Sequence, residues 1–330
     1  MKLTFDRIWE LSRGAVRREI LDGALCLRRF TPEEQLRYRA RREESYLRGL
    51  ATAGMRIVFE TDSPSLTLGV RVLPSTSRRW FCHSVFAGGK RIGELRGRLE
   101  PEETARDLEA RFDLGPGRKE VCILLPWSVE SRITKLETEG DALPVAPKKL
   151  LLAFGDSITQ GYDAHSPEDA YVVKLAEAMD MDLLCKAIGG ERFWPELPGL
   201  YEGPEPDMIT VAYGTNDWAV SPKEMFLRDS RGFLTALRSR FPGVPVTVLA
   251  PIWRADRDTK RADVGSFDAV AAHLEQLTRE LPEMRFVDCG SFVPRDTALF
   301  ADGKLHPNSD GFRHYSDGLL RALLPDRYPF

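Results

Sequence analysis

The chain lacks the sequence features that mark membrane, secreted and nucleic-acid-binding proteins. None of its apolar runs approaches the roughly 20 residues that a transmembrane helix needs. Charged residues interrupt every apolar stretch in residues 1–19, so no signal peptide is predicted there. The formal net charge of −3 over 330 residues gives no basic field for nucleic acid or an anionic membrane. We therefore expect a cytoplasmic protein whose partners include neither a membrane nor nucleic acid.

Cysteine is scarce and scattered. The chain has an odd number of cysteines, and no two of them form a CxxC pair: Cys26, Cys82, Cys122, Cys185 and Cys289. This pattern argues against a disulfide framework and against structural zinc, and it fits a reducing compartment. We expect no metal and no other cofactor.

Two parts of the chain have different patterns, and its length is too great for one ordinary core. Residues 55–138 contain short β-like runs separated by turn-rich pieces, which is typical of an antiparallel sandwich. Ahead of them, Thr31-Pro32-Glu33-Glu34 has the composition of a helix start, and residues 37–49 after it are arginine-rich, as in a solvated helical face. The polar segment 139–149, with two prolines, indicates a linker. We predict a jelly-roll-like sandwich domain over 1–145 and a second domain over 146–330.

The second domain alternates apolar strands with helices. LLLAFG is predicted to be a strand and is followed by the amphipathic PEDAYVVKLAEAMD, and the alternation continues to a last helix near residues 309–324. Such a pattern indicates a parallel sheet covered by helices on both faces, a three-layer α/β fold. Sites in such sheets form at the carboxyl ends of the strands.

Four polar blocks follow the predicted strands or lie near the C-terminus. They are GDS at 155–157, GG at 189–190, GTND at 214–217 and DGKLHPN at 302–308. Each block alone is ordinary turn chemistry. Together they supply a serine, a histidine, an acid and three hydrogen-bond donors where an α/β sheet meets its ligand.

These blocks resemble those of the SGNH hydrolases, also called the GDSL esterases and lipases, over about residues 148–325. The resemblance implies a flavodoxin-like domain with Ser157 as nucleophile, His306 as base and Asp302 as its orienting acid. It further implies an oxyanion hole of Ser157, Gly190 and Asn216, with Gly189 as the second choice for the glycine. One spacing departs from the family, which usually places the aspartate three residues before the histidine.

The other familiar nucleophile motif, G-x-S-x-G, does not fit this chain. Thr159 stands where the second glycine would be.

Four aromatic or imidazole side chains lie near the predicted strand ends. Trp194, Trp218 and Trp253 predict a flat apolar platform suited to sugar rings, with core packing as the equal alternative. His165 follows the nucleophile block and is a candidate pocket residue, against the simpler interpretation of a solvated loop histidine.

A sandwich ahead of an SGNH domain is similar in layout to several bacterial carbohydrate acetyl-esterases. That resemblance implies a serine esterase that removes acetyl or another short acyl group from a sugar or glycoside. Two alternatives stay open: a lipase-like or thioesterase-like hydrolase of longer chains, and a carbohydrate-binding protein without activity. An oligomer is compatible with the sequence.

Overall fold

The computed structural model describes residues 1–260 and 262–328. The chain divides into two compact units. Unit 1 comprises Met1–Lys148, Ser166–Glu168 and Asp182–Cys185, and unit 2 comprises Lys149–His165, Asp169–Met181 and Lys186–Phe330. Of the helices in the described residues, none has the length and apolar character needed to cross a membrane.

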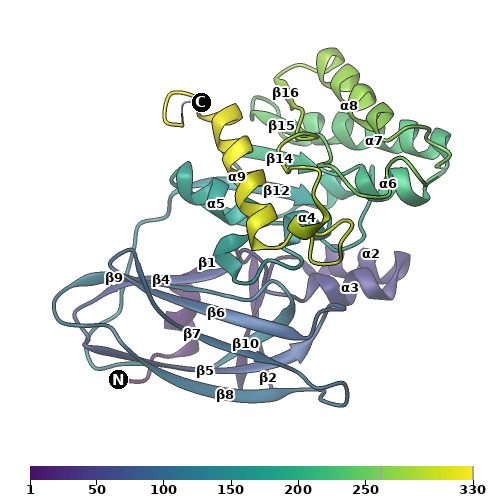
Figure 1. Ribbon diagram of the computed structural model, residues 1–330. Coiled ribbons are helices and arrows are strands. Elements are labelled where there is room, and N and C mark those ends of the chain that lie inside the picture. The colour runs from purple at the N-terminus through teal and green to yellow at the C-terminus, as the bar shows by residue number, and fades with distance from the viewer. Residues whose placement is uncertain (261, 329–330) are drawn as a thin grey trace. The chain divides into compact units, whose positions relative to one another are not determined.

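Unit 1 is built from two antiparallel sheets (Figure 1). The first has the order β1 (Ser12–Arg13), β4 (Arg56–Thr61), β9 (Lys119–Leu124), β6 (Trp80–Ala87) and β7 (Lys90–Arg98), with β11 (Leu143–Pro144) paired to β4. The second has the order β2 (Arg17–Leu21), β3 (Ala24–Arg28), β10 (Val129–Thr138), β5 (Ser65–Pro74) and β8 (Arg106–Asp113).

Alternating side chains from both sheets form the core of unit 1. Ile57 and Phe59 of β4 and Leu66 and Leu68 of β5 are completely buried in one apolar cluster. Successive side chains of a strand point to opposite faces, so each strand contributes every second residue to this core. The predicted antiparallel sandwich is confirmed.

Three short helices accompany these sheets. They are α1 (Phe5–Glu10), α2 (Pro32–Arg41) and α3 (Glu43–Gly49). The predicted start of α2 is correct, because Thr31 and Glu34 form a reciprocal capping box. The arginine-rich segment after it is divided between two helices, since Arg42 is extended with φ −166°.

The segment predicted to be a linker is partly ordered in unit 1. Leu143 pairs with Glu60 and Pro144 with Phe59 in antiparallel register. The linker prediction was therefore wrong for these two residues, which form an edge strand, a position that tolerates proline.

A five-stranded sheet positions the candidate site. Its order is β13 (Met181–Cys185), β12 (Lys149–Gly155), β14 (Met208–Ala212), β15 (Val246–Leu249) and β16 (Met284–Val287). The pairs β12–β14, β14–β15 and β15–β16 are parallel. This doubly wound order confirms the predicted parallel sheet, and its reversal at β12 is the type of place where ligands bind.

Helices cover both faces of this sheet. They are α5 (Tyr171–Ala178), α7 (Lys223–Arg240), α8 (Asp268–Glu280) and α9 (Ser309–Leu323). The strand order reverses direction at β12. Because βαβ crossovers are right-handed as a rule, this reversal puts α5 on one face and α7 and α8 on the other. Helix α9 packs against α5 (Figure 1). Two short helices, α4 (Ser157–Gln160) and α6 (Thr215–Val220), begin directly after β12 and β14.

Candidate active site

The first polar block forms a tight turn from β12 into α4. Asp156 is the N-cap of α4, and its Oδ1 accepts the Ile158 N–H at 3.0 Å. A side chain at Gly155 would overlap Thr159, so only glycine fits at the strand end. Ser157 is the first residue of the helix and is 4% exposed. The turn thus fixes the Ser157 hydroxyl at the carboxyl end of a buried strand.

His306 lies between Ser157 and an acid. Its Nε2 is 2.9 Å from Ser157 Oγ, and its Nδ1 is 2.7 Å from Asp302 Oδ2. Both distances lie in the hydrogen-bonding range. The structure therefore joins carboxylate, imidazole and hydroxyl in one continuous chain of hydrogen bonds.

The unusual spacing between Asp302 and His306 is accommodated by a turn around the carboxylate. Asp302 Oδ1 accepts the backbone N–H groups of Lys304, Leu305 and His306 at 3.0, 2.7 and 3.1 Å. Gly303 has φ +66°, which glycine adopts without strain. Burial alone would raise the pKa of the Asp302 carboxyl, but the hydrogen bonds from His306 and the backbone hold that pKa well below its usual range.

A second carboxylate faces the same imidazole nitrogen. Asp163 Oδ2 is 3.9 Å from His306 Nδ1, and the Asp163 side chain is nearly buried. The backbone of Asp163 is left-handed, with φ +68°. Beside it, the Tyr162 ring lies 5.6 Å from the His306 ring, centroid to centroid. Our sequence analysis missed Asp163; its nearness to the GDS block was the available signal.

Two other acids near the histidine in sequence have partners of their own. Asp296 caps a short 3-10 helix by accepting the Ala298 N–H at 2.9 Å. Asp310 is paired with Arg313 at 3.1 Å on the first turns of α9. Neither of these contacts involves the imidazole.

The three expected oxyanion donors come from three strand ends. The Ser157 N–H opens α4, where a helix leaves its first N–H groups without an intrahelical acceptor. Gly190 sits in the turn after β13 with φ +78°. Asn216, in the first turn of α6, donates its side-chain amide to Glu191 O at 3.1 Å and more weakly to Asp156 Oδ2 at 3.4 Å.

Glycine is required beside Gly190 as well. The Gly189 N–H donates to Gln160 Oε1 at 2.8 Å, which ties this turn to α4. A Cβ on Gly189 would lie 2.6 Å from the Tyr162 hydroxyl oxygen, closer than van der Waals contact allows. The turn therefore packs directly against the aromatic ring that contacts His306.

Two buried acids support these turns. Burial raises the pKa of Asp156 to about 6, partly offset by the Ile158 N–H and by His306 and Arg254. Burial raises the pKa of Asp217 to about 7, although its Oδ1 accepts the Phe193 N–H at 3.3 Å. Each acid accepts a backbone N–H group, so both acids stabilise the turns around the site.

The expected tryptophan platform is not present as three open rings. Trp194, Trp218 and Trp253 are 7%, 1% and 8% exposed. The Trp218 indole N–H donates to Gly265 O at 2.9 Å, and its ring packs edge-on against Phe267. The platform prediction is therefore wrong for Trp218, because apolar burial and a satisfied N–H hold it in the core.

Two other predicted ligand contacts differ in burial, since Trp253 is buried and His165 is exposed. Trp253 packs edge-on against Phe300, close in sequence to the Asp302 turn. His165 is exposed, and its backbone N–H donates to Ser309 Oγ at 3.0 Å. Both stay predictions as substrate contacts.

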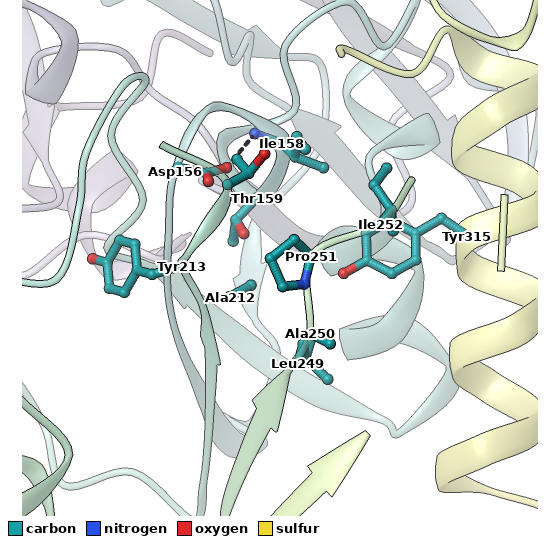
Figure 2. Close-up of a pocket in the computed structure, with 11 residues that line it drawn as sticks. Asp156, Ile158, Thr159, Ala212, Tyr213, Leu249, Ala250, Pro251, Ile252 and Tyr315 are labelled. Atoms are coloured by element: carbon teal, nitrogen blue, oxygen red, sulfur yellow. Dashed lines mark hydrogen bonds between the residues drawn. The ribbon is translucent and has the colours of Figure 1, made fainter. Parts of the chain in front are cut away.

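A small cavity lies behind the nucleophile turn. Figure 2 shows Asp156, Thr159, Tyr213, Pro251 and Tyr315 around it. Its volume is about 20 Å³, enough for roughly one water molecule. Ser157 and His306 are not among its lining residues, so it is not the space in which an ester would meet the hydroxyl.

Comparisons with known proteins give the class of this chain. Residues 153–314 match the model of the GDSL-like Lipase/Acylhydrolase family. Comparison with curated proteins gave no match. The family match over residues 153–314 and the shared fold support an ester hydrolase of the SGNH type.

Several solved structures share the fold over nearly the whole chain. The salicylyl-acyltransferase SsfX3 from a tetracycline biosynthetic pathway is 21% identical, with TM-score 0.82 and 95% of each chain covered. A GDSL-like lipase from Bacteroides ovatus is 17% identical, with TM-score 0.77 and 98% of each chain covered. A family two carbohydrate esterase from Clostridium thermocellum, solved with cellohexaose, is 13% identical, with TM-score 0.64, covering 83% of this chain and 94% of its own. Residues 153–314 of the present chain belong to the GDSL-like lipase/acylhydrolase family.

Proposed function

We propose that the chain is a serine esterase that works through an acyl-enzyme on Ser157. The observation that carries this proposal is the hydrogen-bond chain from Asp302 through His306 to Ser157, with distances of 2.7 and 2.9 Å. A serine hydroxyl is a weak nucleophile until a base takes its proton. Asp302 holds Nδ1 protonated, which leaves the Nε2 lone pair facing that proton.

The reaction has two steps, acylation of Ser157 and hydrolysis of the acyl-enzyme. Ser157 Oγ bonds to the ester carbonyl carbon as its proton passes to His306 Nε2, and the tetrahedral intermediate then collapses. The C–O bond to the alcohol breaks, and the alkoxide leaves with the proton from Nε2. Water repeats the sequence on the acyl-enzyme, with His306 again as base, and releases the acid and the free Ser157 hydroxyl.

The negative charge on the carbonyl oxygen is received by three donors. We assign them as the backbone N–H groups of Ser157 and Gly190 and the side-chain amide of Asn216. Loss of one such donor costs about 3 kcal/mol in comparable sites. The hydrogen bond from Asn216 to Asp156 is long, at 3.4 Å, and therefore weak. Replacing it by a hydrogen bond to the oxyanion costs little free energy.

We propose a short acyl group, acetyl first, carried by a sugar or glycoside. The family two carbohydrate esterases share this two-part fold, and one of them was solved with cellohexaose.

A hydrolysis screen tests this proposal. Acetyl, butyryl and octanoyl aryl esters are compared beside acetylated oligosaccharides, with alcohol acceptors added in one arm because a similar structure is an acyltransferase. We expect kcat/KM to fall from acetyl to octanoyl and the acetylated sugars to be hydrolysed. A preference for octanoyl would favour a lipase-like enzyme. Sugar binding without turnover of any ester would contradict the esterase proposal.

A further inference from the structure

The additional residue in DGKLHPN has a structural use of its own. Lys304 lies between Asp302 and His306, and its carbonyl accepts the Ala255 N–H at 2.9 Å. Its Nζ is 2.9 Å from Asp256 Oδ2. The loop that carries the histidine is thus fastened at two points, one backbone and one ionic, to the segment that follows β15.

The ionic contact continues into the interior. Arg254 is 3% exposed and binds both carboxylate oxygens of Asp256, with Nε at 2.5 Å and Nη2 at 3.0 Å. Its Nη1 donates to Thr215 O at 3.0 Å and to Thr215 Oγ1 at 3.1 Å. Trp218, the tryptophan that the sequence suggested as a platform, lies beneath the Arg254 guanidinium at 4.9 Å.

These contacts connect two of the blocks in the candidate site. Thr215 immediately precedes Asn216, and Lys304 is two residues before His306. We propose that Lys304, Asp256 and Arg254 form a charged bridge that holds the His306 loop in register with the Asn216 turn. The bridge rests on the proposed function, since it positions groups assigned there and touches no reacting atom.

The bridge also explains the spacing. With the aspartate three residues before the histidine, two residues would separate them, whereas here three do, and Lys304 is the one that reaches out to Asp256. The Asp302 carboxylate accepts the backbone N–H groups of Lys304 and Leu305. These hydrogen bonds hold the carboxylate beside His306 although the loop is one residue longer. We infer that the inserted length provides the anchor.

Loss of the Lys304–Asp256 contact should lower kcat more than it lowers the stability of the fold. Lys304 is half exposed, and exposed ion pairs contribute little to folding. Misplacement of a catalytic group by about 1 Å can cost roughly a hundredfold in rate. Arg254 is a poor target, because it is buried and its removal also breaks the two hydrogen bonds to Thr215, which destabilises the fold.

The test compares Lys304→Met, Asp256→Asn and the double variant on an aryl acetate. We expect Lys304→Met to lower kcat by about tenfold, with KM and the melting temperature unchanged. The double variant should be no slower than Asp256→Asn alone, and Lys304→Arg should recover most of the loss. Arg313→Met, which breaks an exposed pair with Asp310 on α9, is the matched control and should behave as wild type.

Two results would overturn the bridge. One is a wild-type kcat in Lys304→Met. The other is a loss in Lys304→Met that is fully additive with the loss in Asp256→Asn, or that appears in KM or melting temperature rather than in kcat. The proposed function is judged separately, since it fails if Ser157→Ala retains esterase activity.

Discussion

Replacing Asp302 by asparagine tests the most unusual part of the site. The amide oxygen of the D302N side chain can still accept the backbone N–H groups of Lys304 and Leu305, so the turn should survive. The group facing His306 Nδ1, however, becomes an amide N–H donor. This donor needs the lone pair on Nδ1 as its acceptor, so the imidazole proton moves to Nε2. Nε2 then has no lone pair with which to accept the Ser157 proton.

The expected loss follows from this tautomer exchange. In fully coupled triads it costs up to about 10⁴ in kcat, equivalent to about 5.5 kcal/mol. Asp163 keeps a second carboxylate 3.9 Å from the ring, which continues to stabilise the imidazolium. We therefore expect a loss in kcat between about 10³ and 10⁴ for D302N, and only about tenfold for D163N, which breaks no hydrogen bond to the imidazole.

The assay is kcat and kcat/KM for an aryl acetate across pH, with folding checked by circular dichroism. D296N and D310N are controls, because Asp296 caps a 3-10 helix and Asp310 pairs with Arg313. Near-normal kcat in D302N would refute the orienting role. A larger loss in D163N than in D302N would assign that role to Asp163.

Three further predictions concern the turns around the site. Asn216→Ala should lower kcat by roughly a hundredfold to a thousandfold with KM unchanged, because its bond forms mainly in the transition state; steady-state kinetics showing a raised KM and normal kcat would contradict this. Gly189→Ala should lower kcat by about tenfold or more, because the added methyl group displaces Tyr162 from the His306 ring. Gly199→Ala is the control in the same assay and should keep the wild-type kcat, because a Cβ there meets nothing within 4 Å. Burial raises the pKa of Asp217 from 3.8 to about 7, so the folded state binds a proton that the unfolded state has lost, and stability falls as pH rises through that window. Asp217→Asn should remove this fall and exceed wild type by at most about 4 kcal/mol at pH 8 in urea denaturation, and an equal pH dependence in both proteins would argue against a charged, buried Asp217.

Local patterns in the sequence contain most of the fold. Alternating apolar residues around Ile57 and Leu66 indicate a sandwich, and the run that ends at Gly155 indicates a buried parallel strand, as the structure has them. The residue types at 31–34 predict the helix start that the structure has at Thr31. Leu143 was not, because a two-residue edge strand depends on a partner, Glu60, that lies far away in the chain.

The site residues that could be predicted from the sequence are those that lie in the polar blocks. Ser157, Asn216 and His306 stand in polar blocks that are ordinary when taken singly, and the joint occurrence of these blocks in the order of the SGNH hydrolases indicates them. Asp163 does not, because its approach to the imidazole depends on a left-handed backbone and on tertiary placement. The burial of Trp218 likewise depends on tertiary contacts with Gly265 and Phe267, which no periodic pattern links to it.

The most direct test of the account is labelling with a serine-directed phosphonate, followed by peptide mapping and by turnover of Ser157→Ala. We expect one modified residue, Ser157, in the wild type, and a folded alanine variant that is neither labelled nor active. Labelling at a different serine, or near-normal hydrolysis by Ser157→Ala, would contradict it.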